Sequence, residues 1–167
     1  KVDTRYVTNY YDTAIAKELG NSMINDNKAD IIWGVAGLAG NGAAEAAQES
    51  GKAWFIGVDS DQEATFSKEL AAVTLTSGLK NVGNAIIWIF DEWDAGRTYF
   101  GKEVNLGLTE GGVGIVTDKN FATLVPQAVQ DKVLAAEAAV RDGSIKVSTA
   151  IGDTTNGAVA LREAMQP

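Results

Sequence analysis

The stretch from Ala29 to Asp61 constrains the fold of this chain more than any other. It holds two short apolar runs, Ile31–Val35 and Ala53–Val58, separated by a glycine-rich turn and an alanine-rich segment. Apolar runs of this length suit strands buried on both faces, and small alanines suit a helix packed closely on a sheet. Strand, helix and strand form a βαβ unit with parallel strands. The sequence therefore predicts an α/β fold with a mostly parallel sheet and helices on both sides, in three layers.

The segment before this unit predicts two more elements. Residues Lys1–Val7 alternate between two sides, which is typical of a half-exposed strand. Asp12 is suited to cap a helix that ends near Met23. The chain also begins at Lys1 without an initiator methionine, so we interpret it as a mature or truncated chain in which a targeting segment would not be visible.

The second half of the chain continues the alternation of elements. A third apolar run, Ala71–Leu75, is followed by Thr76 and Ser77, which we expect to cap a long helix over residues 78–95. Beyond it we expect strands at Glu103–Leu108, Val113–Val116 and Ile145–Val147, a helix from Pro126 to Arg141, and a loose tail over residues 150–167 with one helical turn at Leu161–Met165.

Composition excludes several function classes. The 167 residues carry 14 Lys and Arg against 22 Asp and Glu, a net charge of −8 that argues against nucleic-acid binding. There is no cysteine and no histidine, so thiolate chemistry and a Ser-His-Asp triad are both impossible within this chain. An enzyme would have to rely on carboxylates or lysine. No apolar run is long enough to predict a transmembrane helix.

The glycine turn leaves three interpretations open. Its glycines stand at Gly37, Gly40 and Gly42, a pattern that differs from the G-x-G-x-x-G of dinucleotide-binding proteins. The turn nevertheless follows a strand and opens a helix, as that motif does. The alternatives are a tight turn without a ligand, and a turn whose backbone approaches another small ligand.

Polar and aromatic residues stand where the predicted strands end. Asp59 and Asp61 are candidates for metal ligands, a catalytic pair, ligand acceptors or loop caps. Trp33 is suited either to stack on a planar ligand or to pack in the core. Lys80, expected in the first turn of a helix, opposes the helix dipole, which favours a ligand or carboxylate partner over a solvated side chain.

Five segments in this order resemble one known family. They are Ala29-Asp30-Ile31-Ile32, Ala36-Gly37 with Gly40-Asn41-Gly42, Ile56-Gly57-Val58-Asp59-Ser60-Asp61-Gln62, Leu75-Thr76-Ser77-Gly78-Leu79-Lys80-Asn81-Val82, and Gly107-Leu108 with Gly111-Gly112-Val113. The family is that of the basic membrane proteins, substrate-binding lipoproteins of ABC transporters that include purine nucleoside receptors. The helix from Pro126 to Arg141 also fits the family pattern.

This resemblance implies a type I periplasmic-binding fold, in which two α/β lobes close on a ligand. Family members are roughly twice as long as this chain. By resemblance, residues 1–76 and 110–149 form a carboxyl-terminal lobe. Residues 77–109 form a helix and strand that return to an amino-terminal lobe absent from this chain, and residues 150–167 form a tail.

The resemblance also implies a site. Trp33 would stack on the base of a nucleoside, Ala36, Gly37 and Gly40 would offer backbone contacts, Asp59 would accept from the ribose, and Lys80 would add a polar contact. Asp61 is a further expected ligand-binding residue. The implied protein is an extracytoplasmic lipoprotein that delivers a nucleoside to an ABC permease, without catalysis and without a cofactor. A sugar or other small solute on the same fold, and an enzyme with a nucleotide cofactor, remain the alternatives.

Overall fold

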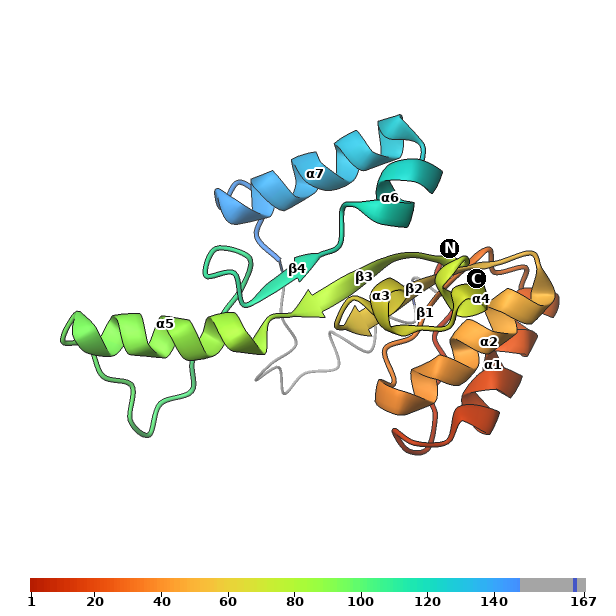
Figure 1. Ribbon diagram of the computed structural model, residues 1–167, viewed down its shortest axis with the longest axis horizontal. Helices are drawn as coiled ribbons and strands as arrows, with labels where there is room; N and C mark the ends of the chain where they lie inside the picture. The colour runs from red at the N-terminus through yellow and green to blue at the C-terminus, as the bar shows by residue number, and fades with distance from the viewer. Residues whose placement is uncertain (148–163, 165–167) are drawn as a thin grey trace.

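A computed structural model describes residues 1–147 and Ala164 of this chain, and it has an open sheet of four strands (Figure 1). The strands are β1 (Ile31–Trp33), β2 (Trp54–Asp59), β3 (Thr74–Lys80) and β4 (Val113–Ile115), in the order β1-β2-β3-β4. The first three are parallel, and β4 is antiparallel to β3. The predicted α/β class with a mostly parallel sheet is therefore confirmed.

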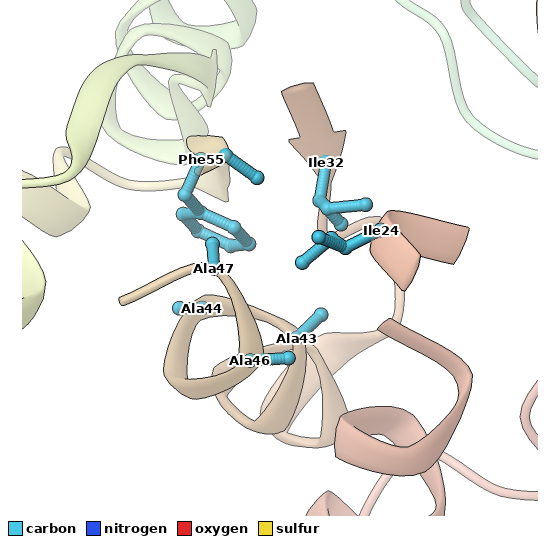
Figure 2. Packing of buried hydrophobic residues seen from close by; sticks show 8 residues of the cluster. Ile24, Ile32, Ala43, Ala44, Ala46, Ala47 and Phe55 are labelled. Atoms are coloured by element: carbon cyan, nitrogen blue, oxygen red, sulfur yellow. The ribbon is translucent and has the colours of Figure 1, made fainter. Parts of the chain in front are cut away.

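One face of the sheet carries the core. Helix α1 (Thr13–Asn25), the 3₁₀ turn η1 (Gly37–Ala39) and helix α2 (Gly40–Ser50) lie against it. Asp12 caps α1 as predicted, because its side chain accepts a hydrogen bond from the Ile15 amide at 3.0 Å. Figure 2 shows Ile24, Ile32 and Phe55 meeting the alanine face of α2. The small alanines allow this close packing, as the sequence predicted.

The glycines of the turn are explained by this packing. A Cβ at Gly42 would lie 1.9 Å from the carbonyl oxygen of Thr13, and one at Gly40 would lie 2.5 Å from that of Gly34. Backbone atoms cannot yield as side-chain ends do, so these positions require glycine wherever α1, α2 and β1 approach this closely.

Shorter helices complete the sheet region. They are α3 (Gln62–Thr65), α4 (Lys68–Ala71) and α6 (Lys119–Leu124), and α6 leads into α7 (Gln127–Arg141). Asn120 ties α6 to the start of β3, since its side-chain amide donates to the carbonyls of Ala71 and Thr74 at 2.8 and 2.9 Å. Phe121 beside it is buried. On the face opposite the core, the β1 side chains of Ile31 and Trp33 stay 45% and 62% exposed.

Helix α5 (Val82–Asp94) projects away from the sheet (Figure 1). None of its residues is buried, although it is the most apolar helix of the chain. Its large exposed side chains are Val82, Ile86, Ile87, Ile89, Phe90 and Trp93. A wide apolar helix face without cover is unusual for a soluble domain and marks an interaction surface.

The loop that follows α5 folds back on it. The rings of Trp88 and Tyr99 lie 5.0 Å apart, and Arg97 donates two hydrogen bonds of 2.5 Å to the carboxylate of Glu92. Tyr99 adds a third hydrogen bond to the same carboxylate at 2.9 Å. These donors stabilise the charged form and lower the pKa of Glu92 to about 2.

The Glu92 carboxyl group is expected to titrate near pH 2 in the folded chain. Because folding lowers this pKa from 4.5, the ion pair stabilises the loop above about pH 4.5 and is lost as the pH falls towards 2. A ¹³C NMR titration of the carboxyl carbon measures the midpoint, and Arg97→Gln should move it back towards 4.5. Equal midpoints in the two proteins would contradict the assignment.

Several predicted elements differ from those observed. The sequence Thr76-Ser77-Gly78 does not cap a helix but continues β3 to Lys80, because the strand pairs with β2 on one side and β4 on the other. Helix α5 begins only at Val82, after Asn81. Helix α6 was not predicted.

No strand forms at Lys1–Val7, Glu103–Leu108 or Ile145–Val147 within the described chain, because none of these segments has a strand beside it to pair with. Helix α7 confirms the helix expected from Pro126 to Arg141. The tail expected over residues 150–167 and its helical turn lie outside the described residues, apart from Ala164.

Candidate functional site

Three of the predicted site residues stand at the carboxyl ends of the parallel strands. Trp33 ends β1, Asp59 ends β2 and Lys80 ends β3. Because these strands are parallel neighbours, their ends lie along one edge, the edge at which open α/β sheets bind ligands. We call this set of three residues the edge site.

Asp59 and Lys80 form an ion pair in the edge site. The Lys80 Nζ lies 2.9 Å from an Asp59 carboxylate oxygen. The Lys80 side chain is 62% exposed and the Asp59 side chain is 49% exposed. An exposed pair of this kind stabilises a fold by only about 0–1 kcal/mol. The ion pair instead holds a cation and an anion at fixed positions that remain open to solvent.

The backbone of Asp59 is strained. Its φ of +69° lies in the left-handed region, which is uncommon for a residue other than glycine. Regular alternation would place Asp59 on the same side of β2 as the buried Phe55. The left-handed turn ends that alternation and lets the carboxylate reach Lys80. Strained backbone conformations of this kind are common at functional sites, and each costs about 1–3 kcal/mol.

Trp33 offers an exposed aromatic surface beside this pair. Its Cζ2 atom lies 3.8 Å from the position that a Cβ on Gly78 would take, and Gly78 precedes Lys80 by two residues on the same side of β3. The side chain is 62% exposed. The core-packing interpretation of Trp33 is therefore wrong.

The loop after β1 brings fewer residues to the edge site than the sequence predicted. Gly37 is exposed with a φ of +56°, Ala36 before it is half-buried, and both follow β1 in the chain. Gly40 is buried against Gly34 and serves packing. The structure does not bring Gly40 to the edge site.

Asp61 is separated from Asp59. It caps α3 by accepting a hydrogen bond from the Ala64 amide at 3.3 Å, and it forms an ion pair with Lys119 at the start of α6. The hydrogen bond that Lys119 donates to Asp61 raises the pKa of Lys119. The two aspartates thus bind different lysines. Within the described chain no group of three acidic residues is arranged to hold a metal ion.

Lys80 also differs in its local structure from the prediction. It stands at the end of a strand rather than in the first turn of a helix, so the helix dipole does not act on it as expected. The expected carboxylate partner is nevertheless present, in Asp59.

Gln62 is a site residue that the sequence analysis missed. Its Oε1 accepts a hydrogen bond from the Val58 amide at 2.9 Å, its backbone amide donates to the Ser77 Oγ at 3.1 Å, and its Nε2 donates to the Asn41 Oδ1 at 3.3 Å. One residue thereby joins β2, β3 and α2 just behind Asp59. Gln62 ends one of the segments that resemble the family, but its hydrogen-bond partners could be identified only once the strand register was known.

The edge site carries groups that can recognise a ligand. An aromatic face can stack on a planar group, a carboxylate can accept two hydroxyl hydrogen bonds, and an ammonium group can donate to a ligand oxygen. The chain supplies neither histidine nor cysteine as a base or nucleophile. This combination favours a ligand with both a planar ring and hydroxyl groups.

Comparison with known proteins shows the family of this chain. A family described as "ABC transporter substrate-binding protein PnrA-like" matches residues 1–148. Basic membrane protein B of Borreliella afzelii (strain PKo) is 35% identical over 129 residues, which cover 72% of this chain and 35% of that protein. The "ABC transporter nucleoside-binding protein BmpA" of Lactococcus lactis subsp. cremoris (strain MG1363) is 29% identical, covering 88% of this chain and 44% of that protein.

A solved structure shares the fold. The solute-binding protein of an ABC transporter system from Conexibacter woesei DSM 14684 superposes with a TM-score of 0.66 at 20% identity, covering 89% of this chain and 46% of that one. The chain therefore spans between a third and a half of the length of the proteins it matches. In the described residues, no helix combines the length and apolar character needed to cross a membrane.

Proposed function

Because the chain belongs to the PnrA-like family of ABC transporter substrate-binding proteins, we propose that it forms the carboxyl-terminal lobe of a nucleoside-binding protein. The family binds solutes and is not an enzyme family. The observation that carries the nucleoside proposal is the edge site, in which Trp33, Asp59 and Lys80 end three neighbouring parallel strands. A relative whose name states nucleoside binding supports the same ligand class.

Each edge-site residue has a defined task in this proposal. The Trp33 ring stacks on the purine base, which is planar and apolar on its faces. The Asp59 carboxylate accepts hydrogen bonds from the two ribose hydroxyls, and Lys80 keeps that carboxylate in place at 2.9 Å and donates to a ligand oxygen. The Ala36–Gly37 backbone offers a further polar contact. Asp61 has no contact with the ligand in this proposal, because Lys119 engages its carboxylate.

A second lobe is expected to cover α5. We propose that residues preceding Lys1 form this first lobe and that residues 77–109 pack into it, which accounts for the exposed apolar side chains of α5. Relatives two to three times as long as the aligned segment have room for such a lobe. The ligand would then lie between the lobes, with the edge site as one wall.

The connection between α5 and the sheet suits a hinge. The side-chain amides of Asn81 and Asn84 both donate to the carbonyl of Gly111, at 3.1 and 2.9 Å, and the Asn81 backbone amide donates to that of Gly112 at 2.9 Å. The two chain crossings therefore run side by side, and Gly111 has a φ of +68° that few other residues adopt. Rotation about this point would close the lobes and present the closed form to an ABC permease.

Family membership also bears on location. Substrate-binding proteins of ABC transporters are generally extracytoplasmic, and we place this protein outside the cytoplasm on that ground. We further propose that it is a lipoprotein held at the membrane, as the basic membrane proteins are expected to be. Neither proposal depends on the identity of the ligand.

Substitution of Trp33 separates a nucleoside from a sugar as the ligand. Because Trp33 is proposed to stack on a base, Trp33→Ala is expected to weaken purine nucleoside binding by about 5- to 150-fold, equivalent to the ~1–3 kcal/mol of one base–aromatic stack. Trp33→Phe, which keeps an aromatic face, should lose much less. Calorimetric titration of the full-length protein with inosine and with ribose measures both. Binding of ribose as tight as that of inosine, and unaffected by Trp33→Ala, would favour the sugar alternative.

A further inference from the structure

Asp59 stands at the centre of a tight turn that closes over three residues. The Ser60 amide donates to the Val58 carbonyl at 2.8 Å, and Asp59 between them has a φ of +69°. A three-residue turn with a positive φ at its centre is rare and strained. Such a conformation persists only where the surrounding structure over-determines it. The turn brings the Asp59 carboxylate to Lys80, so whatever holds the turn also positions this carboxylate.

Gln62 takes the place of a strand partner at the start of this turn. The ladder between β1 and β2 includes the Trp54 amide, which donates to the Asp30 carbonyl at 2.8 Å. The two-residue repeat of that ladder would bring the Val58 amide to the Gly34 carbonyl. However, β1 ends before this point, and the Gln62 Oε1 accepts from the Val58 amide at 2.9 Å instead. A side-chain hydrogen bond therefore fixes the residue at which the turn begins.

Further hydrogen bonds fix Gln62 itself. Its backbone amide donates to the Ser77 Oγ at 3.1 Å, and Ser77 is fully buried in β3. Its side-chain Nε2 donates to the Asn41 Oδ1 at 3.3 Å, and Asn41 lies in the first turn of α2. Both polar atoms of the Gln62 side chain thus have partners. Gln62 connects the turn to a strand and a helix that the core holds in place.

Gln62 also occupies the side of β2 to which regular alternation would direct the Asp59 side chain. Gly57 lies on that side, and a Cβ on it would lie 2.8 Å from the Gln62 Oε1 and 2.3 Å from the Ser77 Oγ. Glycine at this position therefore leaves room for the polar groups that meet there. The Asp59 carboxylate pairs instead with Lys80, which alternation places on the other side of β3 from Ser77.

We propose that Gln62 is a positioning residue of the edge site, which holds the strained turn and so keeps the Asp59 carboxylate beside Lys80 before a ligand arrives. Preorganised groups bind more tightly because the ligand does not have to order them. The inference rests on the proposed function for what the carboxylate binds, whereas the hold on the turn is a property of the ligand-free protein. Gln62 itself does not touch the ligand in this proposal.

Gln62→Met and Gln62→Glu test the hold on the turn in the ligand-free, full-length protein. Methionine is similar in length but is a weak acceptor for the Val58 amide, so the turn should relax and the φ of Asp59 should become negative. Glutamate keeps an acceptor oxygen, so the positive φ should remain. NMR coupling constants of Asp59 measure φ. A positive φ in Gln62→Met, or a negative one in Gln62→Glu, would overturn the proposal. Gln62→Asn, which is too short to reach Val58, replaces Gln62→Met if that variant does not fold.

Calorimetric titration with inosine tests what the turn contributes to binding. Gln62→Met is expected to weaken binding by at least about fivefold, the equivalent of one hydrogen bond. When Asp59→Asn is already present, the same substitution should change the affinity by less than about twofold, because its effect passes through the Asp59 carboxylate. Equal losses with and without Asp59→Asn would show that Gln62 acts independently of Asp59 and would overturn the positioning role.

Asn120→Leu is the matched structural control. It removes two side-chain hydrogen bonds to the carbonyls of Ala71 and Thr74, at the end of β3 opposite the edge site. Urea unfolding should show that Asn120→Leu and Gln62→Met are both less stable than the unsubstituted protein, whereas only Gln62→Met should bind inosine more weakly. An equal loss of affinity in Asn120→Leu would overturn the proposal. If the unsubstituted protein binds no nucleoside, the proposed function fails, and the φ of Asp59 in the Gln62 variants still decides this inference.

Discussion

Replacing Asp59 with asparagine is expected to weaken purine nucleoside binding by roughly 10- to 100-fold. A hydrogen bond to a charged group is worth about 1.5–3 kcal/mol, and each 1.4 kcal/mol corresponds to a factor of about ten in affinity. Asparagine tolerates the left-handed backbone that Asp59 adopts at a φ of +69°, so the substitution removes charge without altering the turn. Calorimetric titration of the full-length protein measures the loss.

Asp61→Asn is the matched control for this substitution. It makes the same chemical change two residues away, where the carboxylate engages Lys119 and caps α3. Asparagine also caps helices well, so α3 should persist. We expect nucleoside affinity to stay within about threefold of the unsubstituted protein. An equal loss of affinity in both variants would contradict a specific role of Asp59 in binding. Unchanged affinity in Asp59→Asn would show that Asp59 does not contact the ligand.

Replacing Gly42 with alanine is expected to lower the free energy of unfolding by about 1–3 kcal/mol. The added Cβ would lie 1.9 Å from the Thr13 carbonyl oxygen, so α1 and α2 would have to move apart. That movement would loosen the core in which Ile24 and Phe55 meet α2 (Figure 2). Urea unfolding followed by circular dichroism measures the change.

Gly83→Ala makes the same substitution at a position without a steric cost. Gly83 lies in α5, and no atom lies within 4 Å of the position its Cβ would take. Because alanine favours helix over glycine by about 1 kcal/mol, this variant should keep or raise stability. If Gly42→Ala were equally harmless, the packing explanation of the glycine turn would be wrong, and a ligand-contacting role would regain support.

Much of the fold was predictable because its central unit is local. The βαβ unit from β1 to β2 is encoded by short apolar runs and an alanine face, which identify strands and helix without reference to the rest of the chain. The end of β3 was not predictable in this way. Thr76-Ser77-Gly78 signals a helix start locally, but pairing with β2 and β4 outweighs that signal.

The segments outside the sheet show that a strand-like sequence does not ensure a strand. Lys1–Val7 and Glu103–Leu108 have the composition of strands, yet in the described chain they lack the partner that a strand requires. A pattern in one segment cannot reveal whether a neighbour is present.

The edge site was predictable to the extent that it depends on strand ends. Trp33 and Asp59 were selected because residues at the carboxyl ends of parallel strands share one edge, and the structure places them there. Lys80 was selected for a helix position that it does not occupy, although its carboxylate partner was expected. Gln62 was missed because its three hydrogen-bond partners come from β2, β3 and α2, which only the folded chain brings together.

Direct titration tests whether the edge site binds a purine nucleoside. Inosine, guanosine and adenosine are titrated calorimetrically into the full-length protein, with the 167-residue chain titrated in parallel. We expect one site per protein with a dissociation constant in the micromolar range or tighter, equivalent to about −8 kcal/mol, and weaker binding by the shorter chain. Absence of binding for all three nucleosides in a folded full-length protein would contradict it.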